Sequence, residues 1–422
     1  MTTEVVLHGR AAANANYIGW SPCSATVRLS NSTGASGPVP VTLRNQHTNA
    51  GGQVVFSTAT QAAAATLQLT LPTDGTPVSF SVAGKFGAPS QNDKDAIIEV
   101  VDAGGQTLSL TPLMVRIRKD ATTLTAAERD RFIGALATFN NRGLGRFSAI
   151  RNMHVSNALD ESHGAGDPDF HDAFLPWHRA YLLDFERQLQ AIDPSVALPY
   201  WRFDKPAPQL YTADFLGAPR LSGSVRFSPT NPLKDWVSDS QLGFRRVLRF
   251  TASGAAQNAN GPVQSEGGTL GQGTEYVEFV LMEGEPHGHA HVCFDGPVNN
   301  PATAPRDPLF FLLLHCNVDR LWAKWQFVNE KWDPTVAGTY TFLGKAGQAG
   351  ATRIGHNLLD TMWPWNGVTA FPRPNPAPGS GLQASVVANA PPQKPTVGDM
   401  LDFQGQLAAG NWHGFDYDDV MF

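Results

Sequence analysis

A histidine-rich stretch, residues 285–325, constrains the fold of this chain more than any other. His287 and His291 stand four residues apart, a spacing that places two side chains on one face of a helix, close enough to share one ion. An apolar run precedes His315, so this third imidazole is expected to emerge from a buried element. Asp319 follows one turn later, where a carboxylate can accept the remaining ring N–H of a ligand histidine and orient it. The stretch therefore predicts half of a metal site between two helices.

Further histidines lie upstream on helical patterns. Pro176 suits the first turn of a helix, which places His178 in that opening turn, and His154 lies on a second helical stretch over residues 147–159. Six histidines on four helical stretches, with no cysteine or carboxylate in a ligand position, favour a borderline metal bound by imidazole alone. Two sites of three histidines that face each other inside a bundle would form a dinuclear centre.

The 422 residues exceed what one hydrophobic core usually supports, which predicts two domains. Residues 1–120 read as short strands separated by turn residues, a pattern typical of an all-β sandwich. From residue 121 onward the pattern is helical, beginning with Thr125 and Glu128 as a capping box. Residues 331–422 read as an irregular tail of this second domain. We therefore expect a mainly α metal-binding domain, residues 121–422, built on a four-helix bundle with long loops and preceded by the sandwich.

Composition narrows the partners and the compartment. A net charge of −6 and a pI near 6.0 give no basic face for phosphates, so nucleic acid and anionic membranes are poor partners. No apolar run is long enough to span a bilayer. The first ten residues lack the features of a secretory signal, and three cysteines are too few for a disulfide framework. These features predict a cytoplasmic protein.

Three motifs together resemble the type 3 copper family, which comprises tyrosinases, catechol oxidases and haemocyanins, and in particular the bacterial tyrosinases. The motifs are FLPWHRAYLLDFE, PHGHAH and DPLFFLLLHCNVDRLW, and the resemblance covers roughly residues 125–330. It implies two copper ions with O₂ as co-substrate. The implied ligands of the first copper are His154 and His178 with one more histidine, and those of the second are His287, His291 and His315.

The spacing of the ligand histidines departs from the family pattern in two places. The remaining ligand of the first copper usually stands nine or ten residues before the FLPWH histidine; His171 is two residues too close and His163 several too far, and we favour His171. The run from Asp307 to His315 has one residue more than usual, so the start of its helix is expected to shift. Phe311 then matches the aromatic ring that packs beside the coppers in the family.

The resemblance implies an oxidase that converts small ortho-diphenols to ortho-quinones with O₂, with weaker hydroxylation of monophenols. Glu278 stands where tyrosinases have a glutamate that orders a water, whereas Gly288 replaces the asparagine that usually shares it. A haemocyanin-like O₂ carrier and an ortho-aminophenol oxidase use the same ligands and remain alternatives. The oligomeric state and the role of the N-terminal domain, as a lid or a scaffold, are left open.

Overall fold

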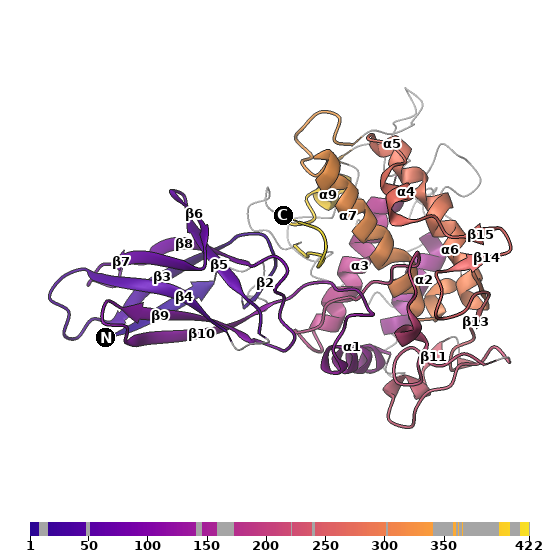
Figure 1. Cartoon of the computed structure of the whole chain (residues 1–422), viewed down its shortest axis with the longest axis horizontal. Coiled ribbons are helices and arrows are strands. Elements are labelled where there is room, and N and C mark those ends of the chain that lie inside the picture. The colour runs from indigo at the N-terminus through magenta and orange to yellow at the C-terminus, as the bar shows by residue number, and fades with distance from the viewer. Residues whose placement is uncertain are drawn as a thin grey trace. The chain divides into compact units, whose positions relative to one another are not determined.

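The computed structural model describes residues 1–7, 16–47, 51–140, 146–157, 173–220, 222–238, 241–300, 303–340, 358–359, 362, 365, 396–405 and 414–421. The chain divides into two compact units, one of strands and one that contains the long helices (Figure 1). The first unit comprises Met1–Arg118 and Gln404–Phe422, and the second comprises Lys119–Phe403.

The first unit contains two five-stranded sheets. One sheet has the order β1 (Thr2–Leu7), β3 (Cys23–Asn31), β8 (Val78–Gly84), β5 (Val54–Thr58) and β6 (Gln61–Ala64). The other has the order β2 (Tyr17–Ile18), β10 (Thr107–Val115), β9 (Ala96–Asp102), β4 (Val39–His47) and β7 (Thr66–Leu71). Neighbouring strands pair antiparallel except β2 and β10, which are parallel.

Alternation of side chains along the strands builds one core between these sheets. Val27 of β3 and Phe80 of β8 point inward from one sheet, and Leu43 of β4 and Ile98 of β9 point inward from the other. In β3 the residues on either side of Val27 are more exposed, as a period of two requires for a sheet with one buried face.

The last described residues of the chain also belong to the first unit. The indole of Trp20 donates to the carbonyl of Tyr417 at 2.9 Å, and the backbone N–H of Trp20 donates to the Asp416 carboxylate at 2.9 Å. The guanidinium of Arg118 lies 3.8 Å from the ring centre of Phe415, a cation–π contact. The sequence pattern assigned this segment to the second domain, whereas the structure groups it with the sandwich.

The second unit is organised around four longer helices: α1 (Ala126–Phe139), α2 (Arg146–Asn157), α3 (Phe174–Gln190) and α7 (Asn317–Asn329). Shorter α-helices are α4 (Glu266–Leu270), α5 (Tyr276–Phe279), α6 (His289–His291) and α9 (Val397–Leu401). Single turns of 3₁₀-helix are η3 (Pro208–Tyr211), η4 (Pro232–Asp235), η5 (Val280–Glu283), η7 (Pro297–Asn299) and η8 (Ala304–Arg306), and the π-helical segments are η6 (Gly284–Gly288) and η9 (Phe311–Cys316). Short hairpins pair β11 (Val237–Ser238) with β12 (Gln241–Leu242), β13 (Val247–Leu248) with β16 (Phe294–Asp295), and β14 (Gln257–Asn258) with β15 (Gly261–Pro262).

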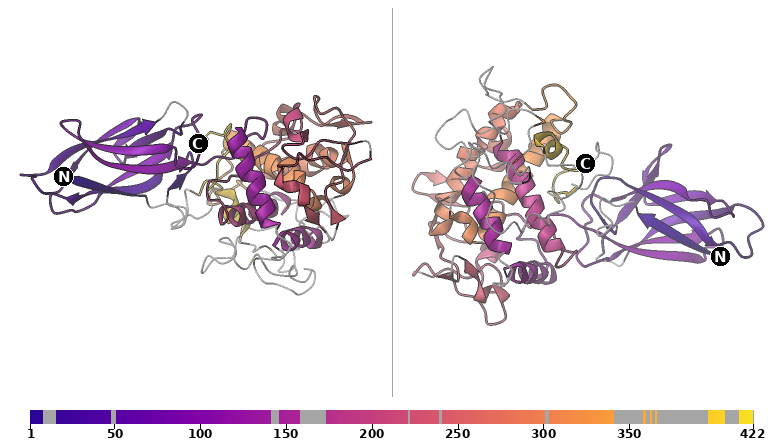
Figure 2. Two further views of the ribbon diagram at one scale, coloured as in Figure 1. Left: turned by 90° about the horizontal axis from the view of Figure 1, so that it is seen from below. Right: turned by 180° about the vertical axis from the view of Figure 1, so that it is seen from behind.

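Local sequence explains where the first helices lie. Thr125 caps α1, and its hydroxyl accepts from the Glu128 N–H while the Glu128 carboxylate accepts from the Thr125 N–H, which confirms the predicted capping box. Helices α2 and α3 lie side by side (Figure 2), joined by a hydrogen bond of 2.9 Å from the Tyr181 hydroxyl to the Ile150 carbonyl. No helix among the described residues is long and apolar enough to cross a membrane.

The expectation of a mainly α fold is wrong. Over the described residues the chain has about equal helix and strand contents, with several sheets. The sandwich contributes most of the strand residues. Between α3 and α7, proline and glycine residues interrupt regular helices. Pro232 and Pro297 begin single turns, and Gly217, Gly243 and Gly296 have positive φ angles that end regular structure.

An ion-pair cluster joins α4 to α7. The Glu266 carboxylate accepts hydrogen bonds from Arg320 at 2.6 Å and from Lys324 at 2.7 Å. Burial by itself would raise the pKa of Glu266, but these two cations outweigh it and hold the pKa below its usual value. The carboxylate is therefore ionised at neutral pH and fastens α4 to the helix that follows His315.

Candidate metal centre

Helix α3 holds His178 rigidly. Every residue of α3 is buried, and Pro176 lies in its first turn as predicted. The His178 Nδ1 atom lies 2.7 Å from the carbonyl oxygen of Phe174, one turn earlier. A carbonyl oxygen only accepts, so Nδ1 carries the proton and donates it, and the lone pair is on Nε2. His178 is thus oriented to bind a metal through Nε2.

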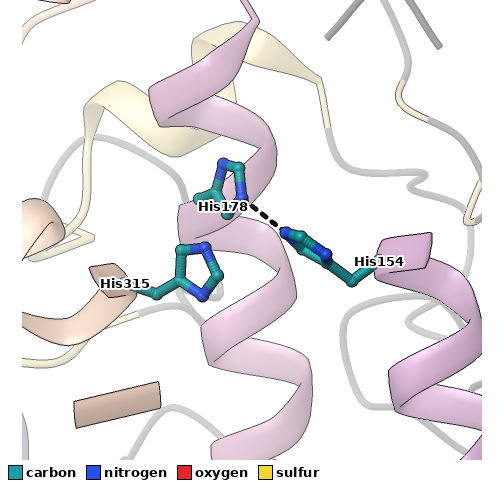
Figure 3. Close-up of side chains that lie close together, drawn as sticks. All are labelled: His154, His178 and His315. Atoms are coloured by element: carbon teal, nitrogen blue, oxygen red, sulfur yellow. Dashed lines mark hydrogen bonds between the residues drawn. The ribbon is translucent and has the colours of Figure 1, made fainter. Parts of the chain in front are cut away.

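Three buried histidines from three elements meet beside α3 (Figure 3). His154 of α2, His178 of α3 and His315 of η9 point toward one another, and their candidate ligand atoms all lie within 4.8 Å. The Nε2 atoms of His154 and His178 are 3.4 Å apart, and the rings of His178 and His315 stack with centroids 4.1 Å apart. The side chains are at most 1% exposed, so bulk water does not reach this group.

A second pair lies on η6 and α6. The rings of His287 and His291 are perpendicular, with centroids 4.9 Å apart. Nδ1 of His287 donates to the Glu283 carbonyl at 2.7 Å, and Nδ1 of His291 donates to the Val298 carbonyl. Both rings are therefore oriented through Nδ1, as His178 is. The spacing of four residues did bring this pair together, although by way of a π-helical turn.

Phe174 links the two groups of histidines. Its ring centroid lies 4.5 Å from that of His178 and 4.8 Å from that of His287. The candidate ligand atoms of His315 lie within 4.8 Å of those of His154 and His178. Its assignment to the second copper stays a prediction. The positions of His171 and His163 lie outside the described residues, so the choice between them also stays a prediction.

Phe310 packs on the rings of His315 and His154. Its centroid lies 4.0 Å from that of His315 and 4.7 Å from that of His154. Phe311, which the spacing favoured, instead stacks on Phe185 of α3 at 4.2 Å. The reason is η9, because a π-helical turn brings residues five apart into register, and Phe310 stands five before His315. The wider π-helical turn accommodates the additional residue between Asp307 and His315.

A buried ion pair anchors the start of this run. The Arg246 guanidinium contacts both Asp307 carboxylate oxygens, at 2.8 and 3.1 Å, and the same carboxylate accepts from the Leu309 N–H at 2.9 Å. The turn that leads into His315 is thus held at its first residue.

Asp319 and Glu278 have partners that the sequence reasoning missed. Asp319 is buried, and its Oδ1 accepts from Nε of Arg179 at 2.5 Å. Glu278 is exposed, and its carboxylate accepts from the N–H groups of Thr274 and Glu275 at 3.1 and 3.2 Å, which caps α5. The only sequence signal for Arg179 was its place next to His178. The capping of α5 could have been read from the spacing of Glu275 and Glu278.

Two other titratable groups near the histidines are neutral. Burial raises the pKa of Tyr181 well above its usual value, so its phenol stays protonated. Burial likewise raises the pKa of Cys293 to about 12, and its thiol donates to the His289 carbonyl at 3.3 Å. Neither group supplies an anion at neutral pH, and the candidate ligands that meet here among the described residues are imidazoles.

Comparison with known proteins identifies the family. A family model described as the common central domain of tyrosinase matches residues 144–327. The chain is 31% identical over 274 residues to the tyrosinase of Streptomyces antibioticus, an alignment that covers 60% of this chain and 94% of that protein. This chain belongs to the tyrosinase family of type 3 copper proteins.

Two further relatives align with this chain over similar lengths. The tyrosinase of Streptomyces glaucescens is 34% identical over 230 residues, which cover 50% of this chain and 82% of that protein. Grixazone synthase of Streptomyces griseus subsp. griseus is 29% identical over 263 residues, which cover 50% of this chain and 85% of that protein. The protein is a copper-dependent polyphenol oxidase with a dinuclear copper centre, and it acts on phenols with O₂.

The residues present fit that cofactor. Buried imidazoles are suitable ligands for copper, and His178, His287 and His291 are oriented by hydrogen bonds through Nδ1. Among the described residues, His154, His178, His287, His291 and His315 would hold the two ions.

Proposed function

We propose that this tyrosinase-family enzyme oxidises ortho-diphenols to ortho-quinones and hydroxylates monophenols more slowly. The observation that carries the proposal is Gly288, directly after His287, in the place where the family resemblance implies an asparagine. Copper, when bound, supplies the electron transfer between the phenol and O₂. Two ortho-diphenols and one O₂ then give two ortho-quinones and two waters.

A monophenol is the more demanding substrate because it must lose a proton before it can bind as a phenolate. Its pKa is close to 10, as for tyrosine, so a base must stand within hydrogen-bond reach. An ortho-diphenol loses its first proton more readily, since the neighbouring hydroxyl hydrogen-bonds to the resulting anion. The balance between the two activities therefore depends on how well the chain supplies a base.

Two carboxylates that lie close to the His287 pair in the sequence already have hydrogen-bond partners. Gly288 has no side chain, and the Glu278 carboxylate caps α5. The Glu285 carboxylate accepts from Gln264 N–H at 2.8 Å and contacts His289 Nδ1 at 2.8 Å, so both of its oxygens are engaged. These contacts support an enzyme that depends on the acidity of its substrate.

Side chains of the chain itself orient the ligands and exclude water. Phe310 and Phe174 pack on the histidine rings, and Trp177 contacts both His154 and His178 at centroid distances of 6.0 and 4.9 Å. An apolar surround of this kind strengthens the electrostatic attraction of a cationic centre for a phenolate.

The test compares substrates on the copper-loaded protein. Oxygen uptake and quinone absorbance are measured with catechol, tyramine and ortho-aminophenol, and the copper-free protein serves as the control. We expect catechol to be turned over fastest, and no turnover by the copper-free protein. Tyramine oxidation as fast as catechol oxidation would overturn the proposal, and faster oxidation of ortho-aminophenol would assign a different substrate class.

A further inference from the structure

The buried guanidinium of Arg179 lies between α3, which carries His178, and α7, which follows His315. Arg179 follows His178 on α3 and is fully buried. Its Nε donates to Oδ1 of Asp319 at 2.5 Å, and Asp319 stands four residues after His315 on α7. The two charged side chains are 1% and 2% exposed. This pair therefore joins α3 to α7 next to the stacked rings of His178 and His315.

Other contacts fix the same guanidinium from several directions. Its Nη1 donates to the Gln326 side-chain oxygen and to the Met400 carbonyl, each at 2.7 Å. The Cζ atom of Arg179 lies 3.7 Å from the ring centre of Trp322. A planar fork of donors fits such a set of acceptors in one orientation, which an ammonium group does not.

The position of Arg179 makes it a link between ligand-bearing elements. Consecutive residues on a helix point about 100° apart, so while His178 faces the histidine cluster, Arg179 reaches α7. The 4.1 Å stack of His178 and His315 depends on the separation of α3 and α7 at this level. We propose that Arg179 is a positioning residue of the dicopper centre, which sets this separation through Asp319. The proposal rests on the copper function of these histidines.

Stability alone does not explain a buried ion pair. Replacing such a pair by apolar residues of similar volume is often neutral or stabilising, because the desolvation of two charges offsets their attraction. An ion pair does impose one geometry, since displacing either partner leaves a buried charge without compensation. This asymmetry separates a positioning role from a packing role in an experiment.

The experiment uses the full chain and two readouts. One is the melting temperature of the copper-free protein, and the other is the rate at which a chelator removes copper from the loaded protein. The variants are Arg179→Met/Asp319→Leu, which keeps the volume, and Arg179→Lys, which keeps the charge but loses the fork. Arg320→Met is the matched control, since Arg320 is equally buried on α7 but pairs with Glu266 of α4.

We expect the double variant to melt lower, as Arg320→Met does, because the Gln326 side-chain oxygen and the Met400 carbonyl lose their donor. Unlike that control, the double variant should release copper about 10- to 100-fold faster, the range typical for groups that orient metal ligands. Arg179→Lys should also release copper faster, and Arg320→Met should melt lower but release copper at the wild-type rate. Wild-type copper retention in the double variant would overturn the proposal. If the double variant does not fold, wild-type retention in Arg179→Lys has the same meaning. A wild-type protein that binds no copper would instead contradict the copper function itself.

Discussion

Gly288→Asn is the sharpest test of why ortho-diphenols should be preferred. Gly288 has helical angles, φ −59° and ψ −38°, directly after the ligand His287. An asparagine there would place an amide oxygen where it can accept a hydrogen bond from a water and polarise it as a base. One such hydrogen bond is worth about 0.5–1.5 kcal/mol, which corresponds to roughly 2- to 10-fold in rate.

The substitution also has a cost that the structure locates. A Cβ atom at position 288 would lie 3.3 Å from the carbonyl oxygen of Glu283, which must shift by a few tenths of an ångström. The same carbonyl accepts the 2.7 Å hydrogen bond from His287 Nδ1. Helix propensity favours alanine over glycine by about 1 kcal/mol, so the strain and the propensity partly offset each other. Gly288→Ala therefore measures the effect of the Cβ atom without the amide.

The assay is the ratio of tyramine turnover to catechol turnover, by oxygen uptake, for the wild type and both variants at equal copper content. We expect Gly288→Ala to change both rates by a similar factor and to leave the ratio near that of the wild type. Gly288→Asn should raise the ratio roughly 2- to 10-fold over Gly288→Ala. Equal ratios in the two variants would refute the reasoning, because the amide would then contribute nothing to deprotonation.

Three further predictions concern other residues. Phe310→Leu should lower copper retention more than Phe311→Leu does, because Phe310 packs on His315 and His154 whereas Phe311 stacks on Phe185. Equal losses in a chelator assay would contradict this. Glu266→Gln should lower the melting temperature by a few degrees at neutral pH. The folded pKa of Glu266 is lowered, so its contribution to stability is present above the unfolded pKa of about 4.3 and is lost as the pH falls through the folded pKa. The melting temperatures of the wild type and the variant should therefore converge in acid. His171→Ala should lose copper from the first site while His163→Ala keeps two coppers per chain, as metal analysis would show, and the reverse result would identify His163 as the ligand.

The sequence by itself determined the chemistry of the site. The spacing of His287 and His291, the helix that starts near Pro176 and carries His178, and the capping box at Thr125 all follow from local rules of helix geometry, which need only neighbouring residues. The kinds of ligand also follow from residue type alone, because imidazoles without carboxylates or thiolates restrict the metal.

The tertiary structure decided which side chains meet. Only the packing of α2, α3 and η9 brings His154, His178 and His315 together, since residues far apart in the chain have no local relation. The π-helical turn that puts Phe310 beside His315 depends on absorbing one extra residue within a buried run, which no periodicity predicts. The link from Arg179 to Asp319 likewise depends on how α3 and α7 pack. The balance of helix and strand was misjudged because the sandwich contributes most of the strand residues and because the two-residue ladders of the second unit form only where distant segments pair.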